Sequence, residues 1–125
     1  MDATTTTAPL VSLVVETTHG TRAVMADLCH QISCHLGKQE RFHLLVDTSK
    51  LTKIDFMALY KDVLVFLKLN RERIGMFIVS SSIIVSNVLV RKLLTSVFKV
   101  YKPVSALKIV DTQEDALQFL GSESY

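Results

Sequence analysis

The spacing of apolar residues along the chain predicts four short strands. Leu10–Glu16 is rich in β-branched residues, and Phe42–Val46 is a short apolar run that ends before Asp47. Ile74–Val79 is apolar throughout, as expected of a strand that is covered on both faces. Ala106–Val110 is the fourth run of this kind.

Between these runs, apolar residues recur at the three- and four-residue spacing of a helix. The first helix is predicted over Arg22–Leu36, followed by Gly37, a residue typical of helix ends. Gly121 is expected to end the last helix in the same way. The apolar stripes of the other three helices are Phe56, Leu59, Tyr60, Val63, Phe66 and Leu67; Val85, Val88, Leu89, Leu93, Leu94 and Val97; and Ala116, Leu117, Phe119 and Leu120.

Polar residues suited to helix capping precede these three stripes. Thr52-x-x-Asp55 and Thr112-x-x-Asp115 resemble capping boxes with a shorter acid. Ser81 or Ser82 would cap the third helix of the chain. Each helix therefore has a defined predicted start.

Strands and helices alternate, which predicts an α/β fold with one mostly parallel sheet of four to five strands and helices packed on it. We expect one domain over residues 10–121, a flexible tail over 1–9 and a short tail over 122–125. In such a sheet, functional loops gather where the strands end. These ends are predicted at residues 16–20, 47–53, 80–82 and 111–112.

Composition narrows the class of protein. The 125 residues are 49% hydrophobic and 21% charged, with a formal net charge of +2. The high apolar content excludes an intrinsically disordered chain. The small net charge argues against a nucleic-acid-binding protein, which is expected to have a strongly basic face. The uncharged run over residues 74–90 is shorter than the roughly 20 residues of a spanning helix, so no membrane span is expected.

Two further features bear on location and assembly. Cys29 and Cys34 would point about 140° apart on a helix, which argues against a local disulfide. With an acidic, polar start in place of a signal peptide, a reducing cytoplasmic location is expected. The mean hydropathy of +0.34 is high, and a homodimer would bury the excess apolar surface.

Two hydroxyl-rich segments follow predicted strands. Asp47-Thr48-Ser49 is either a switch loop open to phosphorylation or a turn held by the Asp47 side chain. Ser80-Ser81-Ser82 is either an anion site at a helix start or a simple helix cap. Residue spacing alone favours the structural alternative for both segments.

Signs of catalysis or metal binding are weak. The sequence has no GxGxxG, GxxxxGK[ST] or GxSxG motif. A zinc site needs three or four protein ligands. His30 and Cys34 share a face of the first predicted helix, and His19 or His43 could complete a site only if the fold brought them close. The strand-end acids suggest a magnesium site like that of a response-regulator receiver, but that fold expects paired acids after its first strand. We therefore predict neither an enzyme nor a cofactor or metal.

Three segments together resemble the sulphate-transporter and anti-sigma-factor-antagonist (STAS) domain. Residues 44–59 are similar to its signature of a strand, Asp-x-Ser/Thr, a short loop and Ile/Val-Asp-Ser-Ser-Gly-Leu. Residues 78–94 resemble its third strand and following helix, and residues 109–120 resemble its acidic cap and terminal helix. The resemblance covers about residues 10–120 and extends to a related lipid-binding-like branch.

The resemblance implies a non-enzymatic regulatory module that binds a protein, such as a kinase-like anti-sigma factor. In the family, phosphorylation of a Ser or Thr at the start of the second helix releases the partner. Here Asp55 matches the motif acid, but Phe56-Met57-Ala58 replaces Ser-Ser-Gly. Binding is then either constitutive or switched at Thr48, Ser49, Thr52 or the serine triplet, unless Phe56 is simply a core residue.

The predicted partner surface combines the loop after the second strand, the start of the second helix and the serine triplet. Its residues are Asp47, Thr48, Ser49, Lys53, Asp55, Phe56, Met57, Ser80, Ser81 and Ser82, with Ser49, Thr48 and Ser81 as phosphoacceptor candidates. The alternative is a small apolar-ligand or lipid-binding protein, by similarity to the second branch. A less favoured alternative is an enzyme that uses the strand-end acids or histidines.

Overall fold

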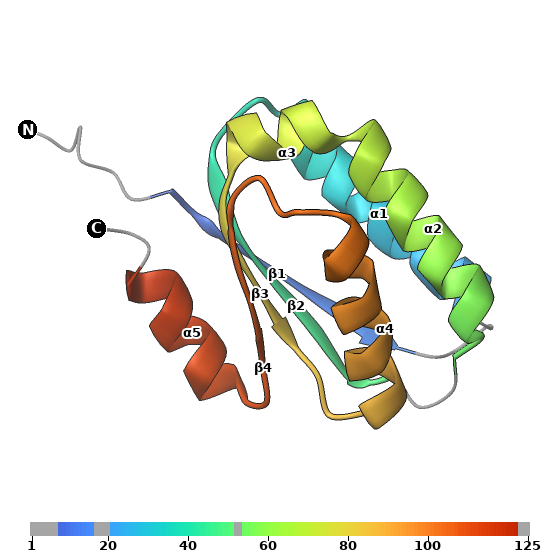
Figure 1. Ribbon diagram of the computed structural model, residues 1–125. Helices are drawn as coiled ribbons and strands as arrows, with labels where there is room; N and C mark the ends of the chain where they lie inside the picture. Colours follow the sequence, from blue (N-terminus) through green and yellow to red (C-terminus); the bar gives the residue numbers. More distant parts are fainter. Residues whose placement is uncertain (1–7, 17–20, 52–53, 123–125) are drawn as a thin grey trace, which may run out of the picture.

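The computed structural model describes residues 8–16, 21–51 and 54–122. Its centre is one parallel sheet of four strands, β1 (Leu10–Glu16), β2 (Phe42–Lys50), β3 (Ile78–Ile84) and β4 (Ala106–Val110) (Figure 1). The strands lie in the order β1-β2-β3-β4, so each pairs with its neighbour in the chain. The predicted α/β fold with a parallel sheet is confirmed.

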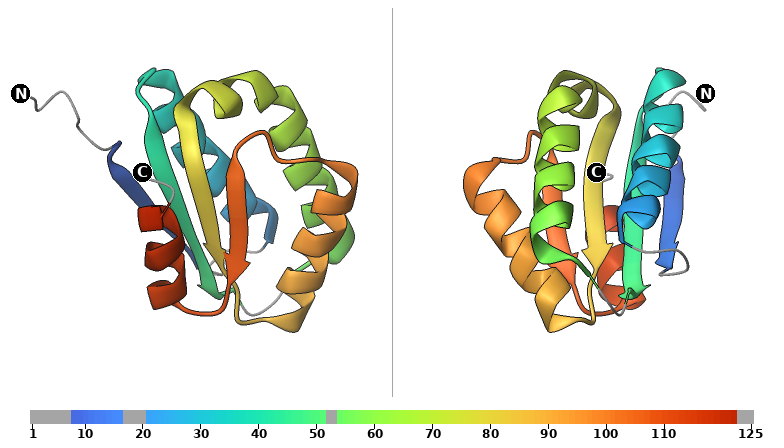
Figure 2. Two further views of the ribbon diagram at one scale, coloured as in Figure 1. Left: turned by 60° about the vertical axis from the view of Figure 1, so that its left-hand side comes forward. Right: turned by 90° about the vertical axis from the view of Figure 1, so that its right-hand side faces the viewer.

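In the described part of the chain, five helices connect and cover the strands. They are α1 (Thr21–Gly37), α2 (Phe56–Leu69), α3 (Arg71–Phe77), α4 (Val88–Val100) and α5 (Gln113–Ser122). Helices α1, α2 and α4 lie on one face of the sheet, and α5 lies on the other (Figure 2). Because the strand order follows the chain order, right-handed crossovers place the connecting helices on the same face.

The main core lies between the sheet and the face covered by α1, α2 and α4. The buried residues Leu44 and Val46 of β2 meet inward positions of the helices, including Leu36 of α1, Leu59 of α2 and Leu93 of α4. A smaller core lies under α5, where the buried residues are Leu45, Ile84, Val110, Ala116 and Leu120. Successive residues of β2 thus enter opposite cores, as the pleat of a strand requires.

The predicted boundary between the third strand and its helix is wrong. The run that begins at Ile74 starts inside helix α3, and the strand β3 continues through the serine triplet to Ile84. Helix α4 is capped by Asn87, whose side-chain oxygen accepts a hydrogen bond from the Leu89 backbone N–H at 2.7 Å. A short apolar run fits a helix or a strand equally well by periodicity. The serines fit a central strand because neighbouring elements bury them.

The second strand is longer than predicted, because β2 continues past Val46 to Lys50, and helix α3 is not indicated by the sequence pattern. The starts of α2 and α5 are as predicted. Asp55 caps α2 by accepting from the Ala58 N–H at 3.3 Å, and Thr112 accepts from the Asp115 N–H at 3.1 Å at the start of α5. After α1, the residue with positive φ is Gln39, at 57°, rather than Gly37. The predicted cap residue Thr52 and most of both predicted tails lie outside the described residues.

Candidate functional site

The loops that follow β2, β3 and β4 meet at one edge of the sheet, which we call the carboxyl edge. The Ser86 hydroxyl donates a hydrogen bond to the Ser49 carbonyl at 3.1 Å. The Asn87 side-chain amide donates to the Leu51 carbonyl at 3.4 Å. The Val85 N–H donates to the Val110 carbonyl at 2.9 Å. These bonds hold the three loops in a defined arrangement.

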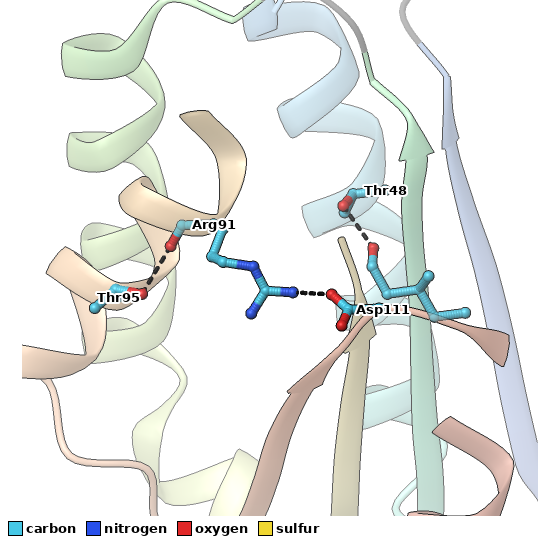
Figure 3. Close-up of polar contacts among 5 residues, drawn as sticks. Thr48, Arg91, Thr95 and Asp111 are labelled. Carbon is cyan, nitrogen blue, oxygen red and sulfur yellow. Dashed lines mark hydrogen bonds and ion pairs between the residues drawn. The ribbon is translucent and has the colours of Figure 1, made fainter. Parts of the chain in front are cut away.

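Asp47, Thr48 and Ser49 lie in the last part of β2, at this edge of the sheet. The Asp47 carboxylate accepts a hydrogen bond from the Ser49 N–H at 2.8 Å, so the local bond expected of Asp47 is confirmed, but it lies within a strand and not in a turn. The Thr48 side chain is buried, and its hydroxyl donates to the Ile84 carbonyl at 2.7 Å (Figure 3). Of the two hydroxyls, only that of Ser49 belongs to an exposed residue.

Apolar side chains project at the carboxyl edge from the starts of α2 and α4. Met57 in the first turn of α2 is 60% exposed, and Val88 and Leu89 in the first turn of α4 are 80% and 51% exposed. Both helix starts lie at the end of the molecule where the strands finish (Figure 1). Phe56 is partly buried, packs against the main core and stacks on Tyr60, so the core alternative is confirmed for this residue.

A charged pair involves the second turn of α4. The Arg91 guanidinium of α4 forms an ion pair with the Asp111 carboxylate, which follows β4 (Figure 3). Both side chains are substantially exposed, so the pair contributes little to stability. Val88, Arg91 and Asp111 lie outside the partner surface predicted from the sequence, although the apolar, uncharged start of α4 is a signal that points to Val88.

The serine triplet does not belong to this surface. Ser80 and Ser82 are 0% exposed and Ser81 is also buried, so their predicted roles as partner contacts or phosphoacceptors are wrong. Ser80 shares a hydrogen bond of 2.7 Å with Nδ1 of the buried His43. The cause is the continuation of β3 through the triplet, which places all three side chains inside the molecule. Lys53 and Thr52 lie outside the described residues.

The described residues contain no group of three or more His, Cys, Asp or Glu side chains placed to hold a metal ion. Cys34 Sγ contacts His30 Nε2 at 3.7 Å on the exposed side of α1. Within the same described ranges, every helix is too short or too polar to cross a bilayer.

The thiol of Cys29 is expected to react slowly with alkylating agents. Burial, together with the nearby Asp62 carboxylate, raises the pKa of Cys29 from 9.0 to about 11. A rise of this size lowers the thiolate fraction near neutral pH by about 100-fold, and the thiolate is the reactive form. Site-resolved mass spectrometry should therefore show Cys29 reacting with iodoacetamide about 100-fold more slowly in the folded protein than in concentrated urea.

Cys34 is exposed on the same helix and serves as the internal control, with a rate that changes little on unfolding. Similar rates for Cys29 in the folded and unfolded protein would contradict the prediction.

The raised pKa of Cys29 also makes the stability of the fold depend on pH. The folded thiol holds its proton more tightly, so this stabilising contribution is present below pH 9.0 and is lost as the pH rises toward about 11.

Comparison with protein-family models, with curated proteins and with solved structures finds no match to this chain. The α/β architecture agrees with a STAS-like fold, and membership in that family stays a prediction from the three motifs.

Proposed function

We propose that this protein is a non-enzymatic, cytoplasmic regulatory module that binds a protein partner through the carboxyl edge. The observation that carries the proposal is the exposure of Met57, Val88 and Leu89 at two helix starts on one edge of the sheet. Exposed apolar residues that gather on one surface are typical of interaction sites. By the resemblance to STAS domains, the partner is a kinase-like anti-sigma factor or another regulatory protein.

The surroundings of the three apolar residues suit binding. Ser86 and Asn87 tie the start of α4 to the loop after β2, so little ordering is needed when a partner docks. Asp47 and the Arg91–Asp111 pair supply polar groups at the same edge of the sheet, and a protein interface usually combines apolar residues with a polar rim.

Regulation by the usual phosphoswitch is not expected. Phe56 and Met57 stand where the family has hydroxyl residues, and Thr48 is buried. Ser49 is the exposed hydroxyl residue of the Asp47-Thr48-Ser49 segment at the end of β2, so a relocated switch would act there. A phosphate at Ser49 would place negative charge beside Asp47 and oppose the hydrogen bond that Asp47 accepts from the Ser49 N–H.

The variant Val88→Asp is expected to lose partner binding while remaining folded. A carboxylate in the middle of a buried apolar contact lacks a partner for its charge, and we expect at least a tenfold loss of affinity, about 1.4 kcal/mol. The measurement is capture from native lysate with the tagged wild type and the variant, followed by identification and a binding titration with the purified partner.

The control is Val65→Asp, because Val65 is 55% exposed on α2 but lies about two turns beyond its start. Equal recovery of the partner with both variants would refute the carboxyl edge as the binding surface. Light scattering of the purified proteins tests for a second copy as the partner, since Val88→Asp would then convert a dimer to a monomer. Intact-mass analysis of the captured wild type shows whether phosphate is present, and peptide mapping shows whether it is at Ser49.

A further inference from the structure

Strand β1 forms one free edge of the sheet. It stands first in the strand order, and no other strand of the described chain pairs with its outer side (Figure 2). The pairing of β1 with β2 is regular from Leu10 to Val14 and shifts before Glu16. The regular part of the free edge therefore runs from Leu10 to Val14, with Ser12 at its centre.

Every second residue of this stretch directs its backbone N–H and C=O groups outward. The Pro9 carbonyl accepts a hydrogen bond from the His43 N–H of β2 at 2.9 Å, so the backbone of Pro9 points toward β2. Successive residues of a parallel strand bond to opposite sides. The backbone groups of Leu10, Ser12 and Val14 therefore point away from the sheet. A row of unpaired groups of this kind is a template for another strand.

The side chains of the same three residues lie on the face of the sheet that carries α5. Leu13 and Val15 are buried in the main core, so the alternation of the strand places Leu10, Ser12 and Val14 on the opposite face. The buried residues beneath α5 come from β2, β3 and β4. Leu10 and Val14 stay 48% and 50% exposed beside them. The free edge thus combines unpaired backbone groups with exposed apolar side chains.

The two edges of the sheet differ in their protection against strand pairing. Natural edge strands are commonly protected by lysine, by proline or by being short. The opposite edge strand, β4, carries the exposed Lys108 at its middle, with the ammonium 6.0 Å from the centre of the Phe119 ring. From Leu10 to Val15, β1 has neither a charged residue nor a proline. Strand pairing is therefore favoured at β1 rather than at β4.

We propose that the β1 edge binds the β1 edge of a second copy of this chain, as an antiparallel pair with a two-fold axis at Ser12. In this register Ser12 lies opposite the second copy's Ser12, and Leu10 lies opposite the second copy's Val14. All of these pairs join residues whose backbone groups point outward. The pairs of Leu10 with Val14 also cover apolar side chains that are exposed in one copy.

The occupant is a second copy because the edge complements itself, as a two-fold interface requires. The uncharged stretch meets its own copy without placing like charges opposite each other. The resulting dimer joins two four-stranded sheets into one continuous sheet. This surface is separate from the carboxyl edge, so the proposal does not depend on partner binding there.

The oligomeric state of the full chain is the first test. Light scattering over a concentration series should show wild-type dimers. Val14→Lys should weaken dimerisation at least about tenfold, because it places a charge opposite the second copy's Leu10. Val65→Lys is the matched control, because Val65 is exposed to a similar degree, at 55%, on α2. Circular dichroism confirms that both variants fold.

Cysteine cross-linking tests the register. Opposite residues of a hydrogen-bonded antiparallel pair have Cα atoms about 5.5 Å apart, which suits a disulfide. Ser12→Cys should therefore form a disulfide-linked dimer under mild oxidation. In the same register the two Val14 positions lie roughly 13 Å apart, so Val14→Cys should not cross-link. The wild type, which has Cys29 and Cys34, gives the background for both variants.

The proposal is overturned if the wild type is a monomer throughout the series, whether or not a strand of another protein occupies the edge. It is also overturned if Val14→Lys dimerises as well as Val65→Lys, or if Val14→Cys cross-links and Ser12→Cys does not. A dimer disrupted by Val88→Asp and not by Val14→Lys would use the carboxyl edge instead. Loss of the dimer in Val14→Lys, together with cross-linking of Ser12→Cys, supports the proposal.

Discussion

Replacing Leu93 with alanine is expected to lower the free energy of unfolding by about 3–5 kcal/mol, as other buried leucines do. Leu93 is fully buried on the inward side of α4. The side chain borders an apolar pocket, so removing its methyl groups would enlarge a space that is already there. The loss should therefore fall in the upper part of the range for leucine-to-alanine changes.

Urea denaturation of wild type and variant measures this loss directly, provided the slope of the transition is unchanged. Leu89→Ala is the matched control, because Leu89 lies four residues earlier on the same helix and is half exposed. We expect the control to lose less than about 1 kcal/mol. A loss below about 1.5 kcal/mol for Leu93→Ala would show that the core closes around the site.

Ser80→Ala and Ser82→Ala are expected to change stability in different directions. Both serines are fully buried, two residues apart on β3. Ser80 is hydrogen-bonded to His43, so its loss leaves a buried ring nitrogen without this partner and should cost about 1–3 kcal/mol. The Ser82 hydroxyl has no hydrogen-bond partner among the described residues. Ser82→Ala therefore removes a buried polar group without breaking a hydrogen bond, and stability should stay the same or rise.

The two variants control each other, because they share the strand, the burial and the chemical change. Chemical denaturation should place Ser80→Ala below wild type and Ser82→Ala at or above it. Equal destabilisation would mean that both hydroxyls have partners of similar strength. The comparison also tests whether the serines are structural, since neither change should affect the carboxyl edge.

Local patterns were enough to predict the class of fold. Apolar runs typical of strands alternate with apolar stripes typical of helices. This alternation favours a parallel sheet covered by helices, whichever residues each element packs against. The stripe on α2 and the Asp55 cap were read from neighbouring residues alone and are confirmed. These features depend on contacts within a few residues, so the sequence carries them directly.

The serine triplet could not be placed from local pattern. Serine is common at helix starts, and spacing does not reveal that β2, β4 and α5 enclose this segment. Its position in a central strand depends on residues far along the chain. His43, which is the partner of Ser80, lies 37 residues earlier.

By itself, the sequence determined the alternation of strands and helices, the inward stripes and most of the helix starts, because these follow from short-range periodicity and capping chemistry. Only the tertiary structure decided which apolar residues are covered. Leu89 and Leu93 share one helical stripe, yet Leu89 is exposed and Leu93 is buried. Only the tertiary structure left an apolar pocket beside Leu93, because packing between distant elements determines how completely a core is filled.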